Sequence, residues 1–185
     1  MKLLAPIESI DFTALDLHGD SFSLSDYRGK AVVLSFFRDT SCPFCLKRVF
    51  DLSIYQQRWQ KSGVEVIAVF SSPVDELANF HKNKFERFRV VPDPELNIYQ
   101  QYGIETSFSG FIKGLIFNVP TIIEGFKKGA KIDKNNPNGL ILPADFLIDE
   151  NGLIVKSWYG RNAADNIPMK YIRRFVQDQA IKGLK

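Results

Sequence analysis

An apolar run that ends in a Cys-x-x-Cys pair constrains the fold of this chain more than any other feature. Residues 31–37 read Ala-Val-Val-Leu-Ser-Phe-Phe, and Cys42 and Cys45 follow them as the only two cysteines. A continuous apolar run of this length is typical of a strand buried on both faces of a sheet. The residues that follow have helical spacing, so the first sulfur is expected at a helix N-terminus. The partial positive charge there favours a thiolate.

This arrangement predicts a redox-active dithiol. Structural zinc takes four protein ligands, and besides the two cysteines the chain offers only His18 and His81, far apart in sequence. We therefore expect neither a metal nor another cofactor. The alternative is that two small buried side chains simply lie close together.

Composition and charge narrow the class of protein. A chain of 185 residues that is 45% hydrophobic can bury one sizeable core, and no linker rich in Pro, Gly or Ser divides it. We expect a single domain over residues 1–185. The net charge of +3 is too small to predict a nucleic-acid partner. No apolar stretch of about 18 residues suggests a membrane span, and the N-terminus lacks the apolar core of a signal peptide, so we expect a cytoplasmic protein.

The order of apolar runs and helical patterns predicts an α/β fold. Residues 9–24 read as two short strands around a turn, which predicts an N-terminal hairpin. After it, buried strands alternate with helices, and such an order favours parallel strands joined by right-handed crossovers. The expected strands are 31–37, 64–70 and 88–94, and the expected helices are 43–61, 73–80 and 95–102.

The helix after the cysteines is expected to be long and amphipathic. Leu46, Phe50 and Ile54 recur at every fourth position. Four more residues broaden this apolar stripe: Val49, Leu52, Tyr55 and Trp59. The pattern predicts that the stripe faces the core.

Residues 104–141 interrupt the alternation with an apolar insertion. Six apolar residues stand at helical spacing: Phe108, Phe111, Ile112, Leu115, Ile116 and Phe117. So apolar a segment has to bury its face somewhere. We interpret the insertion as a cover for one edge of the core. The alternative is that its aromatic residues shape a substrate entrance or a dimer contact, and the oligomeric state stays open.

The chain closes with an expected hairpin and helix. Residues 140–149 and 153–160 have strand character, and Glu150-Asn151-Gly152 supplies the turn that makes them antiparallel. A helix is expected from about Pro168. The sheet is therefore predicted to be mixed.

Three segments together resemble a known family. They are Val32-Val33-Leu34-Ser35-Phe36-Phe37-Arg38 leading to Cys42-Pro43-Phe44-Cys45, the run Leu-Pro-Ala-Asp-Phe-Leu-Ile-Asp-Glu-Asn-Gly at 142–152, and the segment 159–168. The chain resembles the peroxiredoxin-like branch of the AhpC/TSA family, in the thioredoxin superfamily, over about residues 5 to 180. The resemblance implies a thioredoxin-like fold, a central mixed sheet flanked by helices. The N-terminal hairpin and the insertion would be additions to it.

The resemblance also implies roles for individual residues. Cys42 would be the attacking sulfur, and Pro143 would be a cis-proline that faces the cysteines. The family's peroxidase pattern P-x-x-x-T-x-x-C is not kept, because Ser35 and Asp39 stand at its proline and threonine positions. Peroxide consumption is therefore expected to be slow compared with disulfide exchange.

Four polar residues near these motifs have two readings each. Arg38 and Thr40 either help to polarise a peroxide or hold the thiolate, or they are turn residues that face solvent. Asp39 is expected to cap the turn in preference to moving protons. Arg161 stands where the family keeps a second arginine, or it is a surface residue.

The residues thus predict a thiol-disulfide oxidoreductase. Cys42, expected to be the more exposed sulfur, attacks a substrate disulfide, and Cys45 one helical turn on resolves the intermediate. The expected reductant is of the thioredoxin or glutathione type. One alternative is a thiol peroxidase, an antioxidant enzyme that reduces hydrogen or organic peroxides. Another is a metal-binding or non-catalytic module of the same fold.

Overall fold

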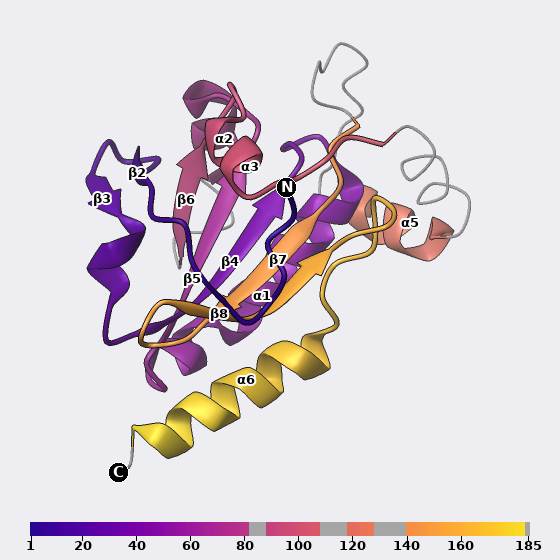
Figure 1. Ribbon diagram of the computed structural model, residues 1–185. Coiled ribbons are helices and arrows are strands. Elements are labelled where there is room, and N and C mark those ends of the chain that lie inside the picture. Colours follow the sequence, from indigo (N-terminus) through magenta and orange to yellow (C-terminus); the bar gives the residue numbers. More distant parts are fainter. Residues whose placement is uncertain (82–87, 108–117, 128–139, 184–185) are drawn as a thin grey trace.

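A six-stranded mixed sheet forms the centre of the protein (Figure 1). The computed structural model describes residues 1–81, 88–107, 118–127 and 140–183. In spatial order the strands are β1 (Ile7–Glu8), β8 (Leu153–Tyr159), β7 (Ala144–Ile148), β4 (Ala31–Phe37), β5 (Val64–Phe70) and β6 (Arg89–Pro92). Strands β4, β5 and β6 are parallel, whereas β7 runs antiparallel to both β4 and β8. The thioredoxin-like α/β fold predicted from the sequence is confirmed.

Strand β4 lies inside the sheet and all seven of its residues are buried. Successive side chains of a strand point to opposite faces, so β4 supplies both halves of the core. Val33 and Phe37 pack on the side of helices α1 (Pro43–Gln60) and α6 (Met169–Lys182). Leu34 and Phe36 pack on the other side, against α3 (Asn97–Gln101) and the N-terminal segment. Helix α2 (Val74–His81) follows β5.

The N-terminal hairpin is confirmed, and it is shorter than the pattern suggested. Strands β2 (Thr13–Leu15) and β3 (Ser21–Ser23) pair antiparallel in a small sheet of their own. Its Phe12 and Phe22 rings meet edge to face at 6.1 Å and join the core beside α3. The hairpin therefore closes the face of the sheet opposite α1.

The predicted apolar stripe of α1 is wrong at two positions. Leu46, Val49 and Leu52 are buried against the sheet, but the Phe50 side chain is 40% exposed and that of Ile54 56%. Each step of four residues overshoots a full helical turn by roughly 40°, so a series at every fourth position drifts around the helix. The buried face follows steps of three and four.

The insertion is described only in part. Helix α5 (Val119–Lys127) packs against α1 (Figure 1), while the predicted apolar helical spacing at 108–117 lies outside the described residues. The closing elements are as expected, because β7 and β8 form an antiparallel pair and α6 buries Ile172, Phe175 and Val176. In the described ranges, no helix has the length and apolarity needed to cross a membrane.

Candidate redox site

The two cysteines lie where the central strand β4 passes into helix α1. Cys42 is the N-cap residue of α1, and Pro43 occupies the first helical position. Proline suits that position because its missing N–H would have no partner there. The backbone N–H of Cys45 donates to the Cys42 sulfur at 3.3 Å. The expected placement of the first sulfur at a helix N-terminus is confirmed.

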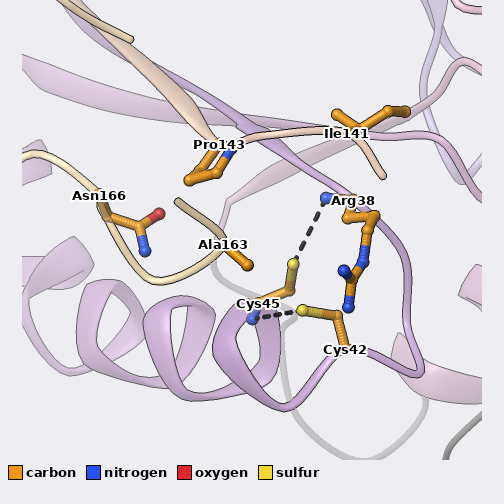
Figure 2. Close-up of a pocket in the computed structure, with 7 residues that line it drawn as sticks. All are labelled: Arg38, Cys42, Cys45, Ile141, Pro143, Ala163 and Asn166. Atoms are coloured by element: carbon orange, nitrogen blue, oxygen red, sulfur yellow. Dashed lines mark hydrogen bonds between the residues drawn. The ribbon is translucent and has the colours of Figure 1, made fainter. Parts of the chain in front are cut away.

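Both sulfurs face a small cavity (Figure 2). It has a volume of about 10 Å³, room for about one water molecule. Besides the cysteines, it is lined by Arg38, Ile141, Pro143, Ala163 and Asn166. Cys42 is only 1% exposed and Cys45 is 7% exposed, so the prediction that Cys42 is the more exposed sulfur is wrong. Arg38 directly after β4, the segment before β7 and the loop after β8 together enclose the site.

Electrostatics distinguishes the two sulfurs even though exposure does not. Burial by itself raises the pKa of the Cys42 thiol, but the hydrogen bond from the Cys45 thiol and the charge of Arg38 bring that pKa below its ordinary value. Burial and the adjacent Cys42 sulfur raise the pKa of Cys45 well above its ordinary value. The pair is therefore arranged to carry its negative charge on Cys42 and its proton on Cys45.

Arg38 links the Cys45 sulfur to a buried carboxylate. Its backbone N–H donates to the Cys45 sulfur at 3.4 Å, and its Nε donates to Asp39 Oδ2 at 3.0 Å. Asp39 also accepts from the Ser41 N–H at 2.7 Å, so it caps the turn as expected. Burial disfavours the charged guanidinium, but the nearby thiols and Asp39 raise the pKa of Arg38 overall. A charged arginine therefore lies beside the thiolate, with part of its field offset by Asp39.

Thr40 and Arg161 lie apart from the cavity in the described structure. The Thr40 N–H donates to Ser72 Oγ at 3.3 Å, and Thr40 is not one of the residues that line the cavity. The Arg161 side chain is 88% exposed and pairs with Asp165 at 3.4 Å, which matches the surface reading.

Pro143 lines the cavity, but the predicted cis bond before it is wrong. Among the described residues, the only cis peptide bond is Ala5–Pro6. The chain around Pro143 runs extended into β7, and the Pro143 carbonyl accepts from the Gly160 N–H at 2.8 Å. This pairing lets Pro143 approach the cysteines through its ring, as an extension of the strand.

Residues that sequence reasoning missed fix the backbone beneath the cysteines. The Ser71 N–H donates to the Arg38 carbonyl at 3.0 Å. The Tyr99 hydroxyl lies within hydrogen-bonding range of two carbonyls, those of Phe37 and Val69, the latter at 3.0 Å. These contacts join the carboxyl ends of β4 and β5. The Ser-Ser pair after β5 was the available signal, because parallel strands bring their carboxyl ends to one edge.

Helix α5 covers the turn that holds the cysteines. A Cβ atom on Gly125 would lie 2.4 Å from both the Cβ and the carbonyl oxygen of Pro43. Glu124 adds an ion pair with Lys47 at 3.5 Å. This part of the insertion therefore lies beside the candidate site. Both readings of the insertion, as a cover for one edge of the core and as a substrate entrance, stay predictions.

We expect Gly125→Ala to destabilise the protein and to expose Cys42. Alanine favours a helix over glycine by about 1 kcal/mol, but overpacking against backbone atoms costs about 1–3 kcal/mol. Urea unfolding should show a lower free energy of unfolding, and a bulky maleimide should label Cys42 faster. Gly183→Ala is the matched control, because its Cβ would meet no atom closer than 3.7 Å. Equal stability and labelling in the two variants would contradict close packing of α5 on the turn.

Among the residues that the structure describes, no group of three or more His, Cys, Asp or Glu side chains is arranged to hold a metal ion. The two cysteines are free thiols. The arrangement is suited to thiol chemistry by the cysteines themselves.

Comparisons with known proteins point to thiol enzymes. A family model described as the AhpC/TSA family matches residues 8–157. Rv2521 of Mycobacterium tuberculosis, whose name places it among the peroxiredoxins, is 24% identical to this chain. The match covers 84% of this chain and 85% of the Rv2521 chain. The thiol-disulfide oxidoreductase ResA of Bacillus cereus is also 24% identical, and the match covers 91% of this chain and 77% of the ResA chain.

A solved structure supports the fold. Peroxidoxin BcpB from Mycobacterium tuberculosis superposes with a TM-score of 0.65 at 14% identity, covering 97% of each chain. At that identity the likeness concerns the arrangement of helices and strands. Function has to be argued from the site.

Proposed function

The chain belongs to the AhpC/TSA family, and we propose that it is a thiol-disulfide oxidoreductase that cycles Cys42 and Cys45 between dithiol and disulfide. The observation that carries the proposal is the geometry of the pair: Cys42 is the N-cap of α1, its sulfur accepts the Cys45 N–H at 3.3 Å, and both cysteines line one cavity with Arg38. The pKa directions, lowered at Cys42 and raised at Cys45, agree with it. A thiolate is the attacking species in disulfide exchange, and a protonated neighbour waits to resolve the intermediate. Relatives named as peroxiredoxins and as thiol-disulfide oxidoreductases support thiol chemistry in general.

The proposed cycle has two exchanges. The Cys42 thiolate attacks one sulfur of a disulfide, and the other half of the substrate leaves as a thiolate. Cys45 then transfers its proton to a departing thiolate and attacks the Cys42 sulfur, which releases the second half as a thiolate and closes the Cys42–Cys45 disulfide. Two electrons pass to the substrate. A thioredoxin- or glutathione-type thiol reductant returns two electrons to the pair.

The small cavity favours low-molecular-weight substrates over folded proteins. Disulfide exchange needs the attacking sulfur to approach the substrate in line, and Cys42 is 1% exposed. A disulfide on a folded protein would have to displace much more of the enclosing chain than a small molecule does. We expect small disulfides to react faster than insulin.

Reduction of a small hydroperoxide is the second candidate, and the size of the cavity favours it. Hydrogen peroxide is close to water in size, and Arg38 lies beside the sulfur that it would oxidise. Asp39 acts against this reaction, because it occupies the position of the family's threonine and already accepts the Nε hydrogen bond of Arg38.

We therefore predict that the wild-type protein reacts with hydrogen peroxide at less than about 10⁶ M⁻¹s⁻¹, a rate constant in the middle of the general enzyme range. Stopped-flow oxidation of the reduced protein gives this value, and titration of free thiols shows whether both are consumed. A small disulfide should consume both thiols, reversibly with dithiothreitol. A faster peroxide reaction would make peroxide reduction the primary activity, and thiols that react with neither oxidant would leave a non-catalytic module.

The cellular setting is part of the proposal. We propose a cytoplasmic location, in which low-molecular-weight thiols keep the pair reduced between turnovers. A reduction potential measured against glutathione would test this directly, because a pair that is strongly oxidising would remain oxidised only outside such a compartment.

A further inference from the structure

A second cavity lies between the last turns of α1 and helix α6. It has a volume of about 240 Å³, several times the space that one water molecule needs. Trp59, near the end of α1, lines it, whereas Cys42 is the N-cap residue at the start of that helix. The rise per residue of an α-helix places these two positions roughly 25 Å apart along the axis. Among the described residues, none lines both this cavity and the redox cavity, so the two are separate.

Arg173 is held in place at the wall of the second cavity. Its Nη2 donates to the Tyr55 hydroxyl at 3.0 Å, and its guanidinium carbon lies 5.1 Å from the centre of the Tyr55 ring. That ring stacks on Trp59 with 5.6 Å between the ring centres, and Trp59 is only 3% exposed. The aromatic pair thus anchors an exposed arginine to the core. A side chain that is already ordered loses less conformational entropy when it binds a ligand.

The second cavity carries positive charge that no lining carboxylate offsets. Arg58 of α1 is its second arginine, and no Asp or Glu is among the described residues that line it. In the described part of the chain, the Arg58 side chain has neither an ion pair nor a hydrogen bond. Within the same residues, Arg173 uses only one of its N–H groups, on Tyr55. Two guanidinium groups with donors to spare therefore favour an anion in this cavity.

The rest of the wall is suited to an apolar group. Val176 and Ala180 of α6 line the cavity together with Trp59. Ser62 and Gln177 add polar side chains that can donate further hydrogen bonds. The volume is below the roughly 300–1,000 Å³ of sites for drug-sized ligands, so the occupant is small. A small anion with an apolar part matches both kinds of wall.

We propose that the second cavity binds a small organic carboxylate. The carboxylate accepts hydrogen bonds from Arg58 and Arg173, because a guanidinium presents paired donors that match its two oxygens. The apolar part of the ligand packs against Val176 and Ala180. The inference is independent of the proposed function, because neither cysteine lines this cavity.

Binding of matched small molecules tests the inference. Hexanoate, hexanamide and acetate are titrated separately while NMR follows the Trp59 indole N–H and the Arg173 Nε–H. Hydrogen bonds to charged groups are stronger than those between neutral groups, so we expect hexanoate to bind at least about 10-fold more tightly than hexanamide. Acetate lacks most of the apolar part and should also bind at least about 10-fold more weakly than hexanoate.

Three results of these titrations would contradict the inference. Hexanamide that binds as tightly as hexanoate would overturn the anion site. Acetate that binds as tightly as hexanoate would overturn the role of the apolar wall. If hexanoate gives no saturable shift of either signal below about 100 mM, the cavity is not a carboxylate site at all.

Arginine variants assign the binding to this cavity, with the Trp59 signal as the readout. We expect Arg58→Gln and Arg173→Gln each to weaken hexanoate binding about 10-fold and to leave hexanamide binding unchanged. Arg174→Gln is the matched control, because Arg174 is an exposed arginine beside Arg173 that does not line the cavity. An equal loss in Arg174→Gln, or unchanged affinity in both other variants, would show that net charge attracts hexanoate elsewhere and would overturn the inference.

A Tyr55→Phe variant tests whether the ordered position of Arg173 matters. It keeps the ring on Trp59 and both arginines but removes the hydroxyl that Arg173 contacts. We expect hexanoate to bind about 2-fold to 10-fold more weakly, because Arg173 then has to be ordered on binding. Unchanged affinity would overturn the positioning role of Tyr55. Since none of these titrations needs disulfide turnover, a protein that reduces no disulfide can still support the site, and one that exchanges disulfides rapidly can still refute it.

Discussion

Replacement of Cys42 with serine will abolish disulfide exchange, whereas replacement of Cys45 will stop the reaction at a mixed disulfide. The Cys42 pKa is lowered by the Cys45 hydrogen bond and by Arg38, so Cys42 supplies the attacking thiolate. Cys45 has a raised pKa and stays protonated at neutral pH, so it cannot replace Cys42 as the nucleophile. Removing an essential nucleophile commonly reduces turnover to the background rate.

The outcome is read by mass spectrometry and by alkylation. Cys45→Ser incubated with a small disulfide should gain the mass of one substrate half, and dithiothreitol should remove it. Cys42→Ser should gain none and should react slowly with iodoacetamide at pH 7. Because both side chains are buried, urea unfolding of each variant shows first that the fold is kept. Fast alkylation in Cys42→Ser together with an inert Cys45→Ser would reverse the assignment of the two roles.

The elements around the site were predictable because their signals are local. The run 31–37 is apolar at nearly every position, as a strand covered on both faces requires, and the structure buries all of it. Pro43 at the first position of α1 and the Asn-Gly turn before β8 mark their boundaries by backbone geometry alone. Such signals do not depend on the rest of the chain.

The surroundings of the cysteines were not predictable, because they come from segments distant in sequence. The burial of Cys42 depends on Ile141, Ala163 and Asn166, which lie about 100 residues or more further along the chain. Nothing near Cys42 shows that these residues will cover it. The role assignment therefore rests on electrostatics, where exposure had seemed to be the guide.

Arg48 and Asp145 illustrate the same limit inside regular elements. Arg48 lies within the predicted helix 43–61 and Asp145 within the predicted strand 140–149, and only the packing of the helix on the sheet brings the charges to 3.6 Å. Likewise, the family resemblance predicted a cis bond before Pro143. The structure has a trans bond there, and the Pro143 carbonyl accepts a hydrogen bond from the Gly160 N–H. A resemblance carries over the fold more safely than it carries over one backbone conformation.

Removal of the Arg38 charge will move the reactivity of Cys42 to higher pH. The alkylation rate follows the thiolate fraction, which rises with pH through the Cys42 pKa. Arg38 lowers that pKa and Asp39 raises it. In Arg38→Met the lowering charge is gone and Asp39 remains, so the pKa rises and the rate profile shifts to higher pH. At pH 7 we expect a loss of about threefold to tenfold, because a thiolate of higher pKa is also more nucleophilic.

Two further variants make this result specific. Arg38→Met leaves the Asp39 carboxylate buried without its ion-pair partner, which lowers the free energy of unfolding by about 3–5 kcal/mol. A double variant, Arg38→Met with Asp39→Asn, avoids this cost because it removes both charges. Its profile should lie between those of wild type and Arg38→Met. Arg161→Met, which changes a side chain that is 88% exposed, should leave the pH profile of the alkylation rate unchanged.

The measurement is the second-order rate constant with iodoacetamide from pH 5 to 10. It is also made in a Cys45→Ser background, so that only one thiol reacts. A profile that stays unchanged in both Arg38 variants would mean that the helix terminus and Cys45, without the arginine, set the charge on Cys42.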